Sequence, residues 1–474
     1  MQLSRLVSVI GGEEHNMKDT DVLSLEFDSR RVTPGSLFIA VKGEKFDGHD
    51  FIEDAIKNGA VALITQRKLA VDIPQIVVKD SREAMAKLAR RFYGGFEAVE
   101  KIGITGTNGK TTTAFLIYSI LEQAGKKPGL IGTVYYMNSR KRIKAERTTP
   151  ESLDIFKLLS DFERDGAEAV VMEVSSHALS LKRMEEIDLD VAVFTNLSQD
   201  HLDFHRTIEE YRAAKMRIFS LLKENGYAVY NIDDPALREI EELPVLNKIG
   251  YGLQKEGDIR AVLTEESIDG LRMEIFYGDK KYPVASGLIG GFNAYNILAA
   301  FTVGCALKQD PEIIIRGIEE LKGVKGRMER VVDNIFIDYA HTPSAVGNVL
   351  TALRKYCRGR LLIVFGCGGD RDRDKRPKMG AVASERADYV FVTSDNPRSE
   401  KPSDIIDDIL KGIKKDNYKV IEDRKEAIRY ALSIKKDDDV LLVAGKGHED
   451  YQIIGEKKIV FDDAEVIREC LKSL

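Results

Sequence analysis

The chain has 474 residues, too many for one hydrophobic core, so its length predicts two to four domains, and we expect three. Hydrophobic residues make up 43% and charged residues 31%, a balance typical of globular proteins and not of disordered ones. The net charge of −6, without a long basic run, argues against nucleic-acid binding.

Membrane insertion and secretion are not indicated by the sequence. No apolar segment reaches 18 residues, and the N-terminal apolar run is too short for a secretory signal. The four cysteines lack the CxxC spacing of a zinc or redox site. We therefore expect a soluble, cytoplasmic and monomeric protein with reduced thiols, and neither a nucleic acid nor a membrane as partner.

The first part of the chain predicts a small α/β unit. Residues 22–27 and 36–41 alternate as strands, and residues 51–60 have helical spacing with Gly59 at the C-terminal end. From residue 98 to about 320, apolar strands alternate with amphipathic helices, which predicts a mostly parallel sheet.

The last part of the chain repeats this pattern, because its apolar runs each open into a polar or glycine-rich loop. Ligands of open α/β sheets bind at the carboxyl ends of the strands, so we expect the functional residues in these loops. The sequence thus predicts an α/β protein of three domains, with the boundaries 1–97, 98–322 and 323–474.

The stretch GITGTNGKTTT at 103–113 lies between a predicted strand and a predicted helix. Glycines let backbone N–H groups close on a phosphate, and a helix N-terminus adds partial positive charge. We predict that Lys110 reaches the β- and γ-phosphates of a nucleotide and that the Thr111 hydroxyl holds Mg²⁺. The spacing departs from the usual phosphate loop at Ile104, where a glycine is expected. A glycine-rich turn with a surface lysine is the alternative.

The next strands end in further candidates. Glu173 closes an apolar strand, where an acid is costly unless a cation meets it, so it is either a metal ligand or an ordinary strand-end acid. His201 and His205 follow the next strand and suit either a second divalent ion or loop hydrogen bonds. Lys215 falls on a predicted helix and, by sequence alone, is a solvated lysine.

Ten motifs occur in one order along the chain. They are GTNGKTTT at 106–113, TTPES at 148–152, MEVSSHAL at 172–179, NLSQDHLDFH at 196–205, YRAAK at 211–215, GRMERV at 326–331, DYAHTP at 338–343, GCGGDRDRDKRPKMG at 366–380, DNPR at 395–398 and GKGHEDYQ at 445–452. Together these motifs resemble the Mur ligase family.

This resemblance implies an ATP-dependent amide ligase of peptidoglycan precursor synthesis. It implies an N-terminal domain for the UDP part of the substrate, a central phosphate-loop ATPase domain and a C-terminal Rossmann-like domain for the incoming amino acid. ATP would activate the D-Glu γ-carboxylate of UDP-N-acetylmuramoyl-L-Ala-D-Glu as an acyl phosphate, which the amine of meso-2,6-diaminopimelate attacks.

The resemblance also implies roles for single residues. The expected ATP contacts are Gly106, Thr107, Asn108, Gly109, Lys110, Thr111, Thr112, Asn296, Arg327, Asp338 and His341. Two Mg²⁺ ions would be held by Thr111, Glu173, His201 and Lys215, the last as a carbamate formed with CO₂. The expected catalytic residues are Lys110, His201 and Lys215.

Two further sets concern the other substrates. Contacts to the UDP-muramoyl dipeptide are expected from Phe27, Ser29, Glu44, Lys45, Phe46, Thr148, Thr149, Ser175 and Arg183. Contacts to diaminopimelate are expected from Arg371, Asp395, Asn396, Pro397, Arg398, Gly445 and Glu449. The alternative for DNPR is a proline turn with a surface arginine.

Three other functions compete with this interpretation. Within the family, the L-lysine-adding muramyl ligase is the main alternative, and Arg398 argues against it because a guanidinium binds the extra carboxylate of diaminopimelate. A folylpolyglutamate synthetase would leave DNPR unexplained. A phosphate-loop switch protein would need no acceptor pocket, so TTPES, SSHAL and DNPR would have no role.

Overall fold

The computed structural model describes residues 1–43 and 46–473. These residues form two compact units. Unit 1 consists of Met1–Thr105, Lys126–Ala192 and Ala214–Tyr227, and unit 2 of Gly106–Gly125, Val193–Ala213 and Ala228–Leu474. The described residues contain an N-terminal sheet, a central group of strands and a C-terminal sheet, which agrees with the predicted three-domain α/β class. The predicted boundaries after residues 97 and 322 remain predictions, because each unit contains several chain segments.

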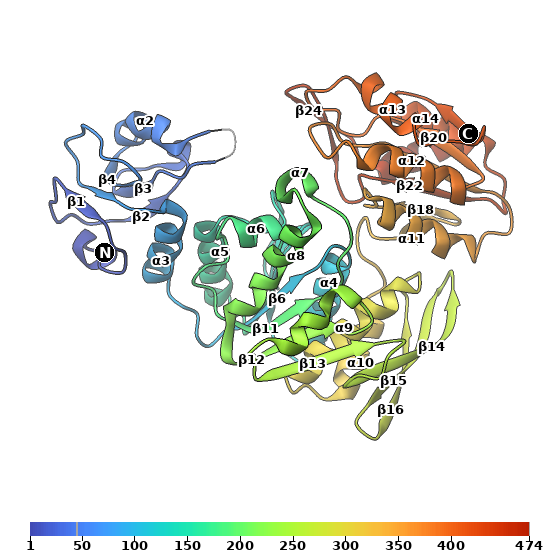
Figure 1. Ribbon diagram of the computed structural model, residues 1–474, viewed down its shortest axis with the longest axis horizontal. Coiled ribbons are helices and arrows are strands. Elements are labelled where there is room, and N and C mark those ends of the chain that lie inside the picture. Colours follow the sequence, from blue (N-terminus) through green and yellow to red (C-terminus); the bar gives the residue numbers. More distant parts are fainter. Residues whose placement is uncertain (44–45, 474) are drawn as a thin grey trace. The chain divides into compact units, whose positions relative to one another are not determined.

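The N-terminal sheet, blue in Figure 1, has the strand order β1-β5-β4-β3-β2. Its strands are β1 (Glu13–His15), β2 (Ser24–Glu26), β3 (Ser36–Ile39), β4 (Ala60–Thr65) and β5 (Gln75–Val77). They pair in parallel except for β1, which is antiparallel to β5. The helices are α1 (Leu3–Val7), α2 (Ile52–Lys57) and α3 (Ser81–Tyr93). Gly59 follows α2 with φ +106°, as a helix-terminating glycine requires.

The second part of unit 1 is built on a fully buried strand. β10 (Ala169–Glu173) lies between the parallel strands β6 (Glu100–Thr105) and β7 (Pro128–Ile131). The antiparallel strands β8 (Tyr135–Met137) and β9 (Arg142–Lys144) continue beyond β7, and α5 (Ser152–Arg164) and α6 (Ser176–Ser180) flank β10 in sequence. Because all five residues of β10 are buried, Glu173 is delivered to the carboxyl end of a core strand.

Three elements belong partly to each unit along the chain. They are β11 (Leu189–Phe194), α8 (Ile208–Met216) and β12 (Leu222–Asn231). Lys215 therefore does lie on a helix, as predicted. The short helix α7 (Leu202–His205) precedes α8 and begins after His201, whose φ is +53°.

The central part of unit 2 packs three helices together. α4 (Lys110–Gln123) contacts α9 (Phe292–Ala306) and α10 (Pro311–Glu320). A Cβ at Gly317 would collide with Ile120, so glycine lets α10 approach α4 closely, and the Ser119 hydroxyl donates to the Gly317 carbonyl at 2.7 Å. Gly125 follows α4 with φ +75°, a conformation that favours glycine at a helix end.

A hairpin region in the centre of the chain differs from the sequence-based expectation of parallel strands. β13 (Asn247–Gly252) is parallel to β14 (Ile259–Ser267), but β14, β15 (Gly270–Tyr277) and β16 (Lys280–Ser286) are successively antiparallel. The reason is the length of the connections. Only two residues join β14 to β15 and β15 to β16, and turns of that length join antiparallel strands.

The C-terminal sheet, orange to red in Figure 1, has the order β17-β18-β22-β19-β20-β21. Its strands are β17 (Glu329–Val332), β18 (Ile335–Asp338), β19 (Leu361–Phe365), β20 (Tyr389–Val392), β21 (Tyr418–Val420) and β22 (Val440–Ala444). Only β17 is antiparallel to its neighbour. The predicted third set of strands corresponds to β18, β19, β20 and β22.

Helices pack against the C-terminal sheet and form two hydrophobic cores with it. One core includes residues of α11 (Pro343–Arg354), α12 (Lys375–Arg386) and α13 (Pro402–Leu410), and the other those of α14 (Arg424–Ile434) and α15 (Asp463–Ser473). A hairpin of β23 (Tyr451–Ile454) and β24 (Lys457–Val460) follows the GKGHE loop. In an open sheet covered on both faces, the loops at the carboxyl ends of the strands are the exposed binding edge.

Across residues 1–43 and 46–473, no helix combines the length and the apolar character that a membrane crossing requires.

Candidate active site

The phosphate loop of residues 106–111 leads into α4. Gly106 and Gly109 have φ values of +145° and +88°, which favour glycine, and a Cβ at Gly109 would collide with the side chain of Asn296. Lys110 Nζ donates to the carbonyl oxygens of Gly106 at 2.7 Å and Thr107 at 2.9 Å. The Lys110 side chain therefore folds back over the loop and is half-buried.

The other side of the loop is tied to residues that follow β11. The N–H groups of Thr107 and Asn108 donate to the backbone and side-chain oxygens of Asn196, both at 2.9 Å. Thr195 Oγ1 donates to the Asn108 carbonyl at 2.6 Å, and Thr107 Oγ1 donates to the Ser198 carbonyl at 3.1 Å. The amides of Thr107 and Asn108 are therefore engaged within the protein. A phosphate would instead meet the N–H groups at the start of α4. These groups have no carbonyl acceptor in a preceding helical turn.

Asn296, the predicted adenine contact, lies behind this loop. It is a buried residue of α9, its Nδ2 donates to Asn293 Oδ1 at 2.7 Å, and its Oδ1 accepts from Thr113 Oγ1 at 3.4 Å. These bonds fix the side chain against the first turn of α4. The structure thus brings Asn296 together with the phosphate loop.

The C-terminal ATP-site candidates reach the same loop through Arg327. Its Nη2 donates to Thr111 Oγ1 at 2.9 Å, and its guanidinium stacks on the Tyr339 ring at 4.7 Å from the centroid. The Asp338 carboxylate accepts from the Met328 N–H at 2.7 Å, and burial raises the pKa of Asp338 although Arg327 opposes the shift. Arg327 is therefore held next to the Thr111 hydroxyl and also interacts electrostatically with the buried Asp338.

Two histidines lie close to one buried acid. Asp200 Oδ2 is 3.4 Å from His201 Nε2 and 3.9 Å from His341 Nε2. Burial lowers the pKa of His341, with Lys375 adding to the shift, so His341 is neutral near pH 7. Burial alone would raise the pKa of Asp200, but the nearby cationic groups lower it on balance. Asp200 therefore stays ionised between the two rings.

The predicted metal ligands are divided between the two units. Glu173 and Lys215 belong to unit 1, and both are almost completely buried. Thr133 donates to the Glu173 carboxylate through its N–H and its hydroxyl, each at 2.8 Å. Thr111 and His201 belong to unit 2. Within the described residues, no three His, Cys, Asp or Glu side chains are gathered as a metal site. The predicted set contains only two such side chains, and its oxygen donors suit Mg²⁺.

The muramoyl-dipeptide candidates fall into two groups in unit 1. Thr149, Ser175 and Arg183 are brought together, because Thr149 Oγ1 accepts from the Ser175 N–H at 3.0 Å and Arg183 Nη1 donates to the Thr149 carbonyl at 3.1 Å. Thr148 Oγ1 lies 3.1 Å from Thr133 Oγ1, next to the end of β10.

The second group of dipeptide candidates belongs to the N-terminal sheet region. Ser29 is buried and Phe27 half-buried, whereas Phe46 is 71% exposed and packs edge-on against Phe51. Glu44 and Lys45, the other two predicted uridine contacts, lie outside the described residues.

The diaminopimelate candidates converge at the carboxyl ends of β19, β20 and β22. Asn396 Nδ2 donates to Glu449 Oε2 at 2.8 Å, and the fully buried Lys446 Nζ donates to Asn396 Oδ1 at 3.1 Å. Burial and the neighbouring Asp395 raise the pKa of Glu449, whereas Lys446 lowers it. Gly445 has φ +112°, and a Cβ there would lie 2.6 Å from Asp395 Oδ2.

The arginines of this set lie at the rim. Arg398 Nη1 donates to the Gly369 carbonyl at 2.7 Å, and Pro397 is buried beside it in the chain. Arg371 is exposed, and its Nη1 donates to the Asp370 carbonyl at 3.3 Å. The arrangement places two guanidinium groups and two carboxylates around one edge of the sheet. Arg398 is half-buried, and whether DNPR binds the amino acid or is only a turn stays a prediction.

Several residues at these sites were not singled out from the sequence. Thr133 supports Glu173, Asn196 holds the phosphate loop, and Lys446 lies between Asp395 and Glu449 at 3.9 and 3.4 Å. Asn196 and Lys446 fall within the quoted motifs, so their position after buried strands was an available signal. Thr133 carries no such signal, because its role depends on the pairing of β10 with β7.

Comparisons with known proteins agree with this geometry. Three family models match successive parts of the chain: the Mur ligase family catalytic domain over residues 22–93, the Mur ligase middle domain over 104–304 and the Mur ligase glutamate ligase domain over 326–447. The UDP-N-acetylmuramoyl-L-alanyl-D-glutamate–2,6-diaminopimelate ligase of Caldanaerobacter subterraneus subsp. tengcongensis is 46% identical over 482 residues, which cover 98% of this chain and 99% of the relative.

Solved structures extend the match to the fold. A structure of a UDP-N-acetylmuramoyl-L-alanyl-D-glutamate–2,6-diaminopimelate ligase has a TM-score of 0.67 at 33% identity, with 95% of each chain covered. The MurF ligase from Thermotoga maritima in complex with ADP has a TM-score of 0.69 at 26% identity, with 96% of this chain and 99% of that chain covered. The chain belongs to the Mur ligase family. It is thus an ATP-dependent, amide-forming ligase, and the family assignment made from the motifs is confirmed.

Proposed function

We propose that this ligase adds meso-2,6-diaminopimelate to the D-Glu γ-carboxylate of UDP-N-acetylmuramoyl-L-Ala-D-Glu. The observation that carries the proposal is the charge pattern of the loops at the carboxyl ends of β19, β20 and β22. Arg398 is half-buried in one of these loops, while Asp395 and Glu449 lie on either side of one buried cation, Lys446. The distal end of diaminopimelate carries a carboxylate and an ammonium. The carboxylate would pair with Arg398, and the ammonium with the acidic side chains of Asp395 and Glu449. The 46% identical relative, named for this activity, supports the same conclusion.

The first chemical step requires stabilisation of a transferring phosphoryl group. The D-Glu carboxylate oxygen attacks the γ-phosphorus of ATP, the bond to the β-phosphate oxygen breaks, and ADP leaves. Lys110 supplies positive charge, and the start of α4 supplies N–H donors where negative charge develops. Arg327, bonded to Thr111, adds a second cation at the same loop.

The second step forms the amide. The amine of the incoming amino acid attacks the acyl carbon, phosphate leaves with the electron pair of the C–O bond, and the amine loses a proton. His341, neutral near pH 7 and held through Nδ1 by the Tyr339 carbonyl at 2.8 Å, and the ionised Asp200 are groups of this region able to accept that proton.

Mg²⁺ and CO₂ are part of the proposal. Thr111, Glu173, His201 and a carbamate on Lys215 would hold the metal, whose charge neutralises phosphate oxygens. Lys215 is almost completely buried, and the proposed carbamate would replace its ammonium by an anion whose charge a bound Mg²⁺ offsets. We also propose a cytoplasmic location, where ATP and a nucleotide-sugar substrate are available, and a monomeric state.

The decisive assay measures ADP release and product mass with purified full-length protein. We expect ADP release that depends on both the UDP-muramoyl dipeptide and diaminopimelate, with one amide formed per ADP. ADP release that is indifferent to the dipeptide would favour the switch protein. Preferred turnover of L-lysine would favour the lysine-adding ligase. Product with a folate acceptor would favour the folylpolyglutamate synthetase.

A further inference from the structure

Two neighbouring loops of the C-terminal sheet carry predicted contacts to the amino acid. The first, residues 366–374, follows β19 and carries Arg371, and the second, residues 393–401, follows β20 and carries Arg398. The Gly369 N–H donates to the Asn396 carbonyl at 2.9 Å, and a Cβ at Gly369 would collide with Pro397. The two loops are therefore in direct backbone contact.

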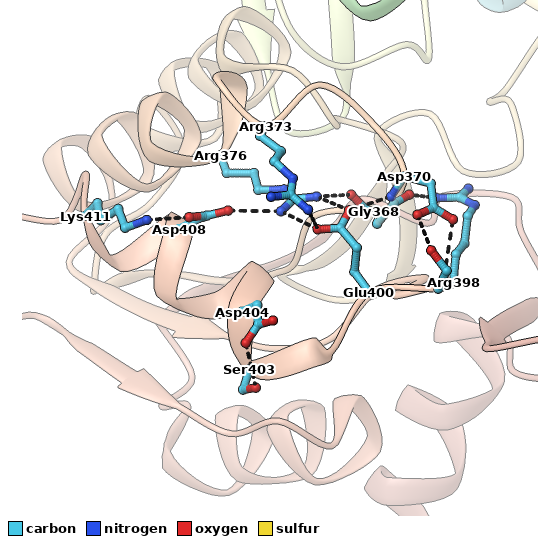
Figure 2. Close-up of polar contacts among 12 residues, drawn as sticks. Gly368, Asp370, Arg373, Arg376, Arg398, Glu400, Ser403, Asp404, Asp408 and Lys411 are labelled. Atoms are coloured by element: carbon cyan, nitrogen blue, oxygen red, sulfur yellow. Dashed lines mark hydrogen bonds and ion pairs between the residues drawn. The ribbon is translucent and has the colours of Figure 1, made fainter.

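A fully buried guanidinium joins these loops, as Figure 2 shows. Arg376, in the first turn of α12, donates to both carboxylate oxygens of Glu400, at 2.8 and 3.1 Å. The same guanidinium donates to the Gly368 carbonyl at 3.3 Å and to Asp408 Oδ2 at 3.0 Å. Arg376 thus contacts the first loop, the second loop and α13 at once.

Glu400 also accepts hydrogen bonds from residues of the first loop. It accepts from the Asp370 N–H at 2.6 Å and from Arg373 Nη2 at 2.8 Å, and the adjacent Ser399 hydroxyl donates to Asp370 Oδ1 at 2.5 Å. Hydrogen bonding to Arg376 lowers the pKa of Glu400 to about 2, so the carboxylate is ionised at neutral pH. The register of the two loops is therefore fixed by charged groups that lie 24 residues apart in the sequence.

Arg398 depends on this register. Its backbone has φ +53°, a conformation that is unusual for arginine, and its Nη1 bonds the Gly369 carbonyl, which belongs to the other loop. A shift of one loop against the other would move that carbonyl and, with it, the guanidinium.

We propose that Arg376 and Glu400 are positioning residues, which set the register of the two loops and so aim Arg398 at the distal carboxylate of the incoming amino acid. This inference rests on the proposed function. A buried ion pair is a weak source of net stability, because desolvation offsets most of the Coulomb attraction. Its bidentate geometry instead specifies an orientation. Arg376 acts through Gly368 and Glu400 and does not itself contact the substrate.

The test is steady-state kinetics of full-length Arg376→Lys, which keeps the charge but cannot form the fork on Glu400. We expect the KM for diaminopimelate to rise about 10- to 100-fold, because a displacement near 1 Å has effects of this size. The KM values for ATP and the UDP-muramoyl dipeptide should stay within about twofold, since their predicted contacts lie elsewhere. Preference for diaminopimelate over L-lysine should fall in parallel.

Arg360→Lys is the matched control. Arg360 bonds Asp439 through Nε at 3.0 Å and Nη2 at 2.7 Å, at the amino ends of β19 and β22, away from the ligand edge of the same sheet. Its loss should leave the KM for diaminopimelate unchanged even if Tm falls. Glu400→Gln is the second test variant. If Arg376→Lys does not fold, the KM of Glu400→Gln for diaminopimelate tests the positioning role.

The outcomes separate the two proposals. Normal wild-type turnover of diaminopimelate, with an unchanged KM in Arg376→Lys and Glu400→Gln, would overturn the positioning role alone. A lower Tm or a lower active fraction at unchanged KM would have the same meaning, because it shows a merely structural role. Wild-type protein that does not use diaminopimelate would overturn the proposed function and this inference with it.

Discussion

The phosphate loop and the amino-acid loops are built in different ways. Residues 106–111 take their shape from two glycines with positive φ and from the start of a helix, all within six residues. The loops at 366–374 and 393–401 take theirs from the Arg376–Glu400 pair and from the bond between Arg398 and Gly369, which spans 29 residues. The backbone conformation of the first site is set mainly by local residues, although Asn196 holds the loop from the end of β11, whereas the second site is set by contacts between two loops that follow different strands.

The comparison also separates two kinds of function. Phosphate is common to many substrates, and a local loop with a cation recognises it without further structure. An amino acid must be distinguished from close analogues, which requires charged groups held in a fixed relation. We expect damage to the phosphate loop to abolish chemistry, and damage to the amino-acid loops to change selectivity first.

The largest effect should come from breaking the local site at its centre. Lys110→Ala should lower the rate of ADP formation about 10³- to 10⁵-fold, because it removes a cation from the transferring phosphoryl group. The fold should persist, because Lys110 is half-buried at the start of α4 and contributes charge rather than core packing. ADP release and circular dichroism check this, with the exposed Lys127→Ala as control. Near-normal turnover in Lys110→Ala would refute its role.

A smaller loss should follow from removing the proposed carbamate. Lys215→Ala should reduce activity about 10²- to 10³-fold, because an anion that holds the metal is lost. Added formate or acetate should restore part of the activity, whereas sodium chloride at equal ionic strength should not. Full activity of Lys215→Ala without any added carboxylate would rule out the carbamate.

The selectivity site should respond differently. Arg398→Ala should raise the KM for diaminopimelate at least about 30-fold, because a buried charge-assisted pair contributes about 2–5 kcal/mol. The KM for ATP should change little. Steady-state kinetics with each substrate varied in turn measures both values. An unchanged KM for diaminopimelate would mean that DNPR is a turn and not a binding loop.

The smallest effect concerns the stability of the amino-acid loops. The pKa of Glu400 is lowered from 4.5 to about 2 by its bond to Arg376, so its ionised form stabilises the fold above about pH 4.5. This contribution is lost as pH falls toward 2. Glu400→Gln should therefore lower Tm by roughly 2–8 °C at neutral pH and by less near pH 3. A Tm difference that is the same at both pH values would contradict this assignment.

The two regions also differ in how much of their structure could be predicted from the sequence. The strand, loop and helix around Lys110 were predictable, because glycine conformation and helix starts are local properties. The contacts of the loop with the rest of the protein were not predictable, because Asn196 and Arg327 bond it from 88 and 216 residues away in the sequence. The burial of Lys215 was equally invisible, because YRAAK by itself predicts a solvated lysine.

The site at the carboxyl ends of β19, β20 and β22 was predictable only as a set of motifs. GCGG, DNPR and GKGHE each follow a buried strand, and parallel strands present their carboxyl ends at one edge, so their convergence follows from topology. Arg376 and Glu400 were not identified, because an ion pair between two loops cannot be deduced without the register of β19 and β20. The antiparallel arrangement of β14, β15 and β16 was also missed. The alternation of strands and helices along the chain predicted parallel strands, but the short turns between these three strands make them antiparallel.

The most direct test of the account is the ratio of kcat/KM for meso-diaminopimelate to kcat/KM for L-lysine, measured with wild-type protein at saturating ATP and UDP-muramoyl dipeptide. The two amino acids differ by the distal carboxylate that Arg398 is proposed to bind. We predict a ratio of at least about 30, which corresponds to the lower limit of about 2 kcal/mol for such a pair. Equal kcat/KM values for the two amino acids would contradict the account.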